Sequence, residues 1–156
     1  KESLFNILSN WIELDAIKVL DLFAGTGNLS YEFASRGASQ VLAVDKFPAC
    51  VKFIQKQAKL FDISDEIMTQ RIDVFKFISL HRAKYDLIFA DPPYDHPKFH
   101  LLPDLILDRA LLNENALLII EHDMRNNFEK HNNCIEVRQY GQSYFSFFKQ
   151  KIQTKA

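Results

Sequence analysis

The residues with the most specific chemistry are Asp91-Pro92-Pro93-Tyr94, in the middle of the chain. Two consecutive prolines fix the backbone and remove two amide donors, so this corner presents the Asp91 carboxylate and the Pro92 carbonyl as neighbouring acceptors. Two adjacent acceptors match the two hydrogens of a planar exocyclic amino group. Tyr94 can stack on the ring that carries this group, as aromatic side chains do with flipped bases. A simple strand terminator would not explain why an acid stands there.

A glycine-rich turn, Asp21-Leu22-Phe23-Ala24-Gly25-Thr26-Gly27, is the second candidate for ligand binding. Gly25 and Gly27 permit a tight turn and a close approach of the backbone to a ligand. The match to the dinucleotide-binding fingerprint is incomplete, because Ser30 stands at its third glycine position. On this motif alone, a ligand-binding loop and an ordinary tight turn, with Asp21 bonded to loop amides, are equally good interpretations.

Two further acids follow segments that are expected to be strands. Asp45 closes the second apolar run and can accept hydrogen bonds from both ribose hydroxyls of an adenosine. Together with the glycine turn, this interpretation is favoured over a cap for the helix near Pro48. Asp73 can accept from an adenine amino group or cap the helix that follows it, and these two interpretations are compatible.

The elements that position these acids are strands alternating with helices. Short apolar runs predict strands at 18–23, 41–45, 66–72, 85–90 and 116–120. Helical spacing predicts helices at 2–12, 29–34, 48–61, 73–80 and 98–110. Residues 134–140 and 143–149 predict a hairpin around Gly141. The pattern indicates an α/β fold: a mostly parallel sheet with helices on both faces and an antiparallel C-terminal hairpin.

A parallel sheet would bring the scattered acids together. Ligands of such sheets bind outside the carboxyl ends of the strands, near the switch in strand order. Four acids lie at or just after the carboxyl end of a predicted strand: Asp21, Asp45, Asp73 and Asp91. We therefore expect all four at one rim of the sheet.

Composition bounds the class of protein. The chain has 156 residues, of which 47% are hydrophobic and 25% charged, and its formal net charge is −1. These values predict one globular domain over residues 1–156 and exclude a disordered tail, a collagen-like repeat and a coiled coil. No apolar run is long enough to span a membrane. Cys50 and Cys134 offer neither a disulfide framework nor a zinc spacing, so we expect a cytoplasmic protein without a metal.

The glycine turn at 21–27 and the corner at 91–94 resemble those of class I S-adenosylmethionine-dependent methyltransferases that modify exocyclic amines. With Ser3-Leu4-Phe5-Asn6-Ile7-Leu8, Ala43-Val44-Asp45 and the Tyr140-Gly141 hairpin, the chain more closely resembles the bacterial 16S ribosomal RNA guanine-N2 methyltransferases. Because DNA adenine-N6 enzymes have similar corners, the segment at 3–8 is what favours the RNA family.

The resemblance implies a Rossmann-like, seven-stranded methyltransferase domain that binds S-adenosylmethionine, with Phe47 beside Lys46 flanking the adenine. The implied cofactor-binding residues are Asp21, Phe23, Gly25, Gly27, Asp45, Lys46, Asp73, Val74 and Asp91. The implied catalytic residues, which hold the target guanine, are Asp91, Pro92 and Tyr94. The implied partner is ribosomal RNA in the small subunit. The protein is expected to be a monomer and to have no contact with a membrane. The family carries a basic arm before the helix at 3–8, and we expect most of it to lie outside a sequence that begins at Lys1.

Three alternatives stay open. A DNA adenine-N6 methyltransferase would need a target-recognition segment for which the chain has no room. A small NAD-binding protein would leave the corner at 91–94 unexplained, and a module that binds the cofactor without transfer would not need Asp91. For RNA contact, lysine and arginine side chains offer only weak signals, because such stripes are more often solvated faces. They are Arg36, Lys52, Lys56, Lys59, Arg82, Lys84, Lys149 and Lys151.

Overall fold

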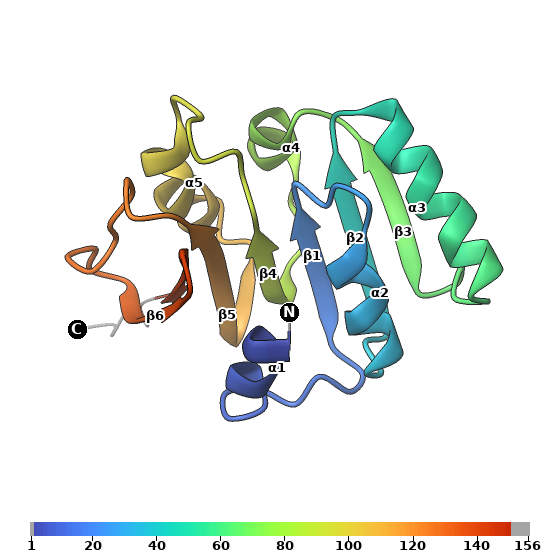
Figure 1. Ribbon diagram of the computed structural model, residues 1–156, viewed down its shortest axis with the longest axis horizontal. Helices are drawn as coiled ribbons and strands as arrows, with labels where there is room; N and C mark the ends of the chain where they lie inside the picture. The colour runs from blue at the N-terminus through green and yellow to red at the C-terminus, as the bar shows by residue number, and fades with distance from the viewer. Residues whose placement is uncertain (1, 151–156) are drawn as a thin grey trace.

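A seven-stranded sheet forms the centre of the protein in the computed structural model, which describes residues 2–150 (Figure 1). The strand order is β3-β2-β1-β4-β5-β7-β6. The strands are β1 (Lys18–Leu22), β2 (Gln40–Asp45), β3 (Ile67–Arg71), β4 (Tyr85–Ala90), β5 (Leu112–His122), β6 (Cys134–Tyr140) and β7 (Ser143–Phe148). Strands β1 to β5 pair in parallel, and β7 runs antiparallel to both β5 and β6. The expected mostly parallel sheet and its terminal hairpin are confirmed.

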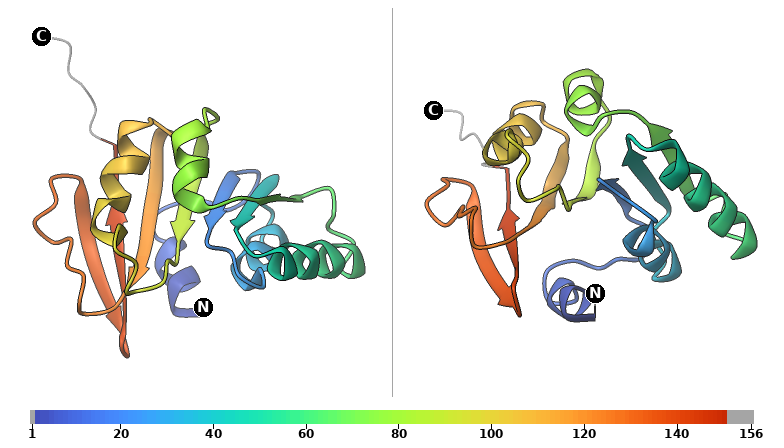
Figure 2. Two further views of the ribbon diagram at one scale, coloured as in Figure 1. Left: turned by 90° about the horizontal axis from the view of Figure 1, so that it is seen from above. Right: turned by 45° about the horizontal axis from the view of Figure 1, so that its top comes forward.

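Helices cover both faces of the sheet (Figure 2). One face carries α1 (Glu2–Leu8), α2 (Asn28–Ser35) and α3 (Pro48–Leu60), and the other carries α4 (Val74–Leu80), the 3₁₀ turn η1 (Phe99–Leu101) and α5 (Leu102–Asp108). Neighbouring residues of a strand point to opposite faces of the sheet. Because the central strands are nearly continuous apolar runs, both of their faces are apolar. Val19 packs with Phe5 and Phe33 in one core, whereas Leu20 packs with Phe77 in the other.

Three boundaries differ from those that periodicity predicts. Helix α1 ends at Leu8 rather than at residue 12, and tight turns follow it. The segment at 98–110 is a 3₁₀ turn followed by the short helix α5, which begins next to Pro103, a residue suited to a first helical turn. Strand β5 runs from 112 to 122 and not only from 116 to 120, since its end pairs with β7 as far as His122 and Tyr144. This extension brings Glu121 to the rim.

The pairing register places the carboxyl ends of β1, β4 and β5 side by side at the same edge of the sheet. Leu22 pairs with Ala90, and Ala90 pairs with Ile120. The residues that follow β1 and β4, and the end of β5, therefore meet at one rim, as the sequence predicts for its acids. Among residues 2–150 no helix is long and apolar enough to cross a membrane. Lys1 and Lys151 lie outside the described residues.

Candidate functional site

A cavity of about 530 Å³ opens at the carboxyl ends of β1, β2 and β4. A second cavity of about 240 Å³ adjoins it and shares Phe23, Gly25 and Asp91 with it. The larger cavity is lined by Phe23, Gly25, Asp45, Lys46, Phe47, Cys50, Asp73, Val74, Asp91, Pro92, Pro93, Tyr94 and His96. The site that the sequence predicts at this rim is thus a physical hollow, and its size is that of ordinary small-ligand pockets.

Asp21 lies at the inner end of the site, where β1 gives way to the glycine turn. Its side chain is only 2% exposed, and its Oδ2 accepts a hydrogen bond of 2.6 Å from the Ser30 hydroxyl. Burial raises the pKa of Asp21 to about 7, the charge of Asp45 adds to the rise, and the bond from Ser30 opposes it. Asp21 lines the smaller cavity, so its bond to Ser30 fixes a carboxyl group beside the ligand space.

Asp45 joins the end of β2 to the glycine turn. Its Oδ2 accepts from the Gly25 amide and its Oδ1 from the Phe47 amide, both at 2.9 Å. Gly25 has φ +57°, and a Cβ there would meet no atom within 4 Å, so the turn is open to a ligand at this point. Asp45 is buried and lines the large cavity. It therefore shapes the loop and also faces the cavity.

Gly27 has a different part from Gly25. It lines neither of these cavities. Its φ is +85°, and a Cβ there would lie 2.8 Å from Ile54 and 2.9 Å from Tyr31. Gly27 is thus the point where the N-terminus of α2 packs against α3 without room for a side chain.

The opposite wall of the cavity comes from α4. Asp73 is the N-cap of this helix and accepts from the Lys76 amide at 3.1 Å, as one of its two predicted roles requires. Asp73 and Val74 also line the cavity, with Lys46 and Phe47 from the end of β2. The Phe47 ring is 56% exposed, a high value for a large apolar side chain. An apolar ring and a carboxylate are suitable neighbours for a purine.

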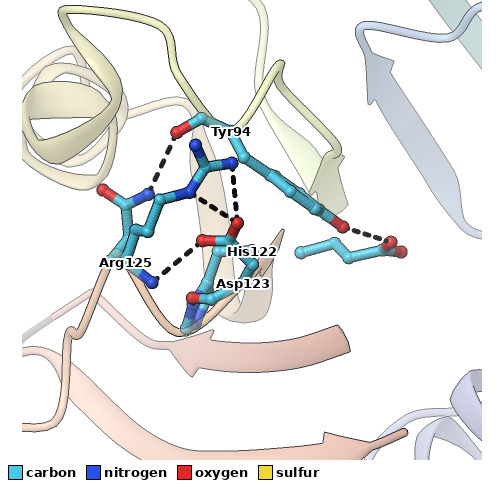
Figure 3. A network of polar contacts seen from close by, with 6 residues as sticks. Tyr94, His122, Asp123 and Arg125 are labelled. Atoms are coloured by element: carbon cyan, nitrogen blue, oxygen red, sulfur yellow. Dashed lines mark hydrogen bonds and ion pairs between the residues drawn. The ribbon is translucent and has the colours of Figure 1, made fainter. Parts of the chain in front are cut away.

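The corner after β4 forms the third wall. Asp91 directly follows the strand, Pro92 is buried, and Tyr94 donates from its hydroxyl to Glu121 Oε2 at 3.1 Å (Figure 3). Asp91 is exposed, yet the surrounding protein displaces part of its hydration; this desolvation raises the pKa of Asp91 to about 7, and the charges of Glu121 and Asp21 raise it further. Burial and the Glu121 charge raise the pKa of Tyr94 to about 12, so its hydroxyl stays protonated.

The sequence-predicted residues converge, with Gly27 as the exception. Ten of them line the large cavity: Phe23, Gly25, Asp45, Lys46, Phe47, Asp73, Val74, Asp91, Pro92 and Tyr94. Sequence reasoning missed Ser30 as the partner of Asp21, although its place in the fingerprint was a signal. It also missed Glu121, which stands at the carboxyl end of β5 as the other acids do at their strands. Cys50 and His96 also line the cavity, although no sequence motif predicted a place for them there.

Within the described part of the chain, no three His, Cys, Asp or Glu side chains are grouped so that they could hold a metal ion. The His96 Nδ1 accepts from the Lys98 amide at 3.0 Å, and its ring stacks on Phe75. The polar groups available in the cavity are carboxylates, backbone amides, the Tyr94 phenol, the His96 imidazole, the Lys46 ammonium and the Cys50 thiol.

A family model described as conserved hypothetical protein 95 matches residues 1–149. The chain belongs to this family. Among curated proteins, it is 32% identical over 128 residues to "Putative rRNA methyltransferase YlbH" of Bacillus subtilis, which covers 79% of this chain and 67% of that protein. It is 29% identical over 126 residues to "Ribosomal RNA small subunit methyltransferase D" of Buchnera aphidicola, covering 79% of this chain and 62% of that protein.

This family member shares its fold with solved structures. One is an RNA methyltransferase from Salinibacter ruber in complex with S-adenosyl-L-homocysteine. Its TM-score is 0.73 at 14% identity, and the match covers 95% of this chain and 90% of that one. At this identity the likeness shows the fold alone. The chain spans about two thirds of the length of the two curated relatives.

Proposed function

We propose that this protein transfers a methyl group from S-adenosylmethionine to the exocyclic N2 of a guanine in small-subunit ribosomal RNA. The observation that carries the proposal is one cavity that contains both the Gly25–Asp45 loop and the Asp91-Pro92-Pro93-Tyr94 corner. The first suits the donor and the second suits an aromatic amine. The names of the two curated relatives support ribosomal RNA as the substrate, and that of the Buchnera protein supports the small subunit.

The residues of the cavity fit the proposed donor. The open face of Gly25 leaves room for the methionine part, and the Asp45 carboxylate has lone pairs for ribose hydroxyls in addition to its two amide bonds. Phe47, Asp73 and Val74 offer an apolar ring and an acceptor for the adenine. When bound, S-adenosylmethionine supplies a methyl group already activated by its sulfonium charge.

The protein then needs to supply position rather than a strong nucleophile. The lone pair of guanine N2 is delocalised into the ring. Hydrogen bonds from the two N–H groups to the Asp91 carboxylate and the Pro92 carbonyl favour a pyramidal nitrogen, whose lone pair can point at the methyl group. Positive charge develops on N2 as the bond to carbon forms, and Asp91 stabilises that charge electrostatically. The methylated nitrogen is acidic and loses its proton to water, so no strong base is needed.

The test is transfer of labelled methyl groups to three substrates in parallel. They are assembled small ribosomal subunits that lack the modification, naked ribosomal RNA and duplex DNA, and the modified nucleosides are identified by mass. We expect N2-methylguanosine from the subunit or the RNA. N6-methyladenine from DNA would replace the proposal with the rival adenine enzyme, and binding of the donor without any product would overturn methyl transfer by this chain.

Asp91 is the residue whose substitution tests the mechanism most directly. Asp91→Asn keeps the size of the side chain but removes its charge and one acceptor, so we expect kcat to fall at least about 100-fold. Binding of S-adenosylmethionine, measured by calorimetry, should stay within about tenfold, because Asp45 and the glycine turn are intact. Near wild-type transfer by Asp91→Asn would overturn the assigned role.

The proposal includes the setting of the reaction. Its partner is the RNA of the small subunit, and the protein acts as a monomer in the cytoplasm. The small net charge of −1 implies modest affinity for naked RNA and a real dependence on a structured target. Gel filtration and a comparison of subunit with naked RNA in the transfer assay test both statements.

A further inference from the structure

The hydroxyl group and the backbone carbonyl of Tyr94 are both held by residues 121–126, at the end of β5 and in the loop after it (Figure 3). Its hydroxyl donates to Glu121 Oε2 at 3.1 Å, and its backbone carbonyl accepts from the Asn126 side-chain amide at 3.3 Å. The aromatic side chain of the corner at 91–94 is therefore positioned from a different element, which the sequence motif does not include.

The segment that holds Tyr94 is itself fixed. His122 is buried, and its ring nitrogens lie 2.6 Å from the Ser146 hydroxyl and 2.9 Å from the Asp123 carbonyl oxygen. The Asp123 carboxylate accepts from the Arg125 backbone amide at 2.9 Å and from its guanidinium at 2.7 Å (Figure 3). A loop with this many bonds can impose a position on its neighbour.

The register explains why Glu121 comes so near the reacting group. Ala90 pairs with Ile120, so Asp91 and Glu121 are the next residues on two adjacent parallel strands, which lie about 4.8 Å apart. Two carboxyl groups now stand on one side of the corner. The titratable groups that face Asp91 are Glu121 from β5, Asp21 from β1 and the phenol of Tyr94 from its own loop.

We propose that Glu121 is a positioning residue for methyl transfer: it fixes the Tyr94 ring beside the target base and places a second negative charge next to Asp91. This inference rests on the proposed function and deepens it. The fixed ring lowers the number of orientations that a flipped base can adopt. The second charge raises the pH at which Asp91 ionises, and once Asp91 is ionised it adds to the field that stabilises positive charge on the amine.

Substitutions separate the two effects of Glu121. Glu121→Gln keeps an oxygen that can accept from Tyr94 but removes the charge, whereas Glu121→Ala removes both. Tyr94→Phe removes the hydroxyl alone. Glu114→Gln is the matched control, because Glu114 is an exposed glutamate near the other end of the same strand.

We expect the pH midpoint of kcat/KM to fall by about one unit in Glu121→Gln, because a like charge beside Asp91 is lost. The KM for RNA should stay within about twofold. In Glu121→Ala and in Tyr94→Phe the KM for RNA should rise roughly three- to tenfold. In the double variant that combines Glu121→Ala with Tyr94→Phe, the KM for RNA should rise no further than in either single variant, since both substitutions remove the same hydrogen bond. Glu114→Gln should behave as wild type.

A titration of the Asp91 carboxyl carbon by NMR, in wild type and Glu121→Gln without RNA, separates this inference from the proposed function. Its midpoint should move to lower pH in the variant. If no RNA is methylated but the midpoint moves, the proposed function fails and the coupling of Glu121 to Asp91 stands. An unmoved midpoint overturns the charge effect. An unchanged KM in both Glu121→Ala and Tyr94→Phe overturns the positioning of the ring.

Discussion

Asp21 is a carboxyl group taken out of water, and its hydrogen bonding to Ser30 compensates only part of that cost. Its pKa is raised from 3.8 to about 7. A raised pKa in the folded state means that the protonated form stabilises the fold. This contribution is fully present below the unfolded pKa, near 4, and is lost as the pH rises through about 7.

We therefore expect Asp21→Asn to be more stable than wild type at pH 8, by about 2 kcal/mol or about 5 °C in Tm. The amide oxygen of Asn can still accept from Ser30, and no buried charge has to form. The difference should shrink towards pH 4. Thermal unfolding of both proteins from pH 4 to pH 8 measures it, with the exposed Asp65→Asn as control. Parallel curves for Asp21→Asn and wild type would contradict the assignment.

At the scale of elements, the passage from β1 into α2 depends on two glycines that are not equivalent. Gly27 combines φ +85° with a Cβ position under 3 Å from side-chain atoms of Ile54, on α3, and of Tyr31, on α2 itself, so these side chains would have to shift to admit a methyl group. Gly141, in the hairpin, has φ +59° and no neighbour within 4 Å. The first is constrained by backbone and packing, the second by backbone alone.

Gly27→Ala should accordingly cost about 2–4 kcal/mol of unfolding free energy, and Gly141→Ala only about 1 kcal/mol. Urea denaturation of the two variants against wild type gives both values. Gly25→Ala completes the series, since it should cost about as little stability as Gly141→Ala yet weaken the binding of the donor. Equal losses for Gly27→Ala and Gly141→Ala would show that packing between α2 and α3 is not what requires the glycine.

The order of elements could be predicted from the sequence, because apolar runs, glycines and prolines mark strands and turns directly. The acids at the ends of β1, β2 and β4 follow from that order together with the rule for parallel sheets. What could not be predicted was the end of β5. The apolar run ends at Ile120, and only pairing with β7 continues the strand to His122 and brings Glu121 to the rim. Long-range pairing of this kind leaves no local signal.

The dual use of single residues was also beyond the sequence. Asp73 caps α4 and lines the cavity, and Asp45 binds two amides and lines the same cavity. Residue type and spacing allow each role, but only the folded chain decides whether both occur together. Ser30 illustrates the same point, since a departure from the glycine fingerprint becomes the hydrogen-bond partner of a buried acid.

At the scale of the whole molecule, the strand order places β1 between β2 and β4, with α2 and α4 on opposite faces. The chain direction across the sheet reverses at this point, which is where open α/β sheets bind ligands. The two connected cavities lie there, and their walls come from elements that are distant in the sequence. A ligand in them would link both halves of the sheet.

Such a ligand should stabilise the whole fold, because only the folded chain forms the site. At a concentration of 100 times Kd, S-adenosylmethionine or S-adenosylhomocysteine should add about 2.7 kcal/mol, or about 5–10 °C in Tm. NADH at the same concentration should add nothing if the third wall of the site, the corner at 91–94, takes the place of a nicotinamide pocket. Asp45→Ala should abolish the shift by loosening the glycine turn and removing the ribose acceptor. Stabilisation by NADH alone would instead favour the dinucleotide-binding alternative, and an undiminished shift in Asp45→Ala would move the adenosine to another part of the cavity.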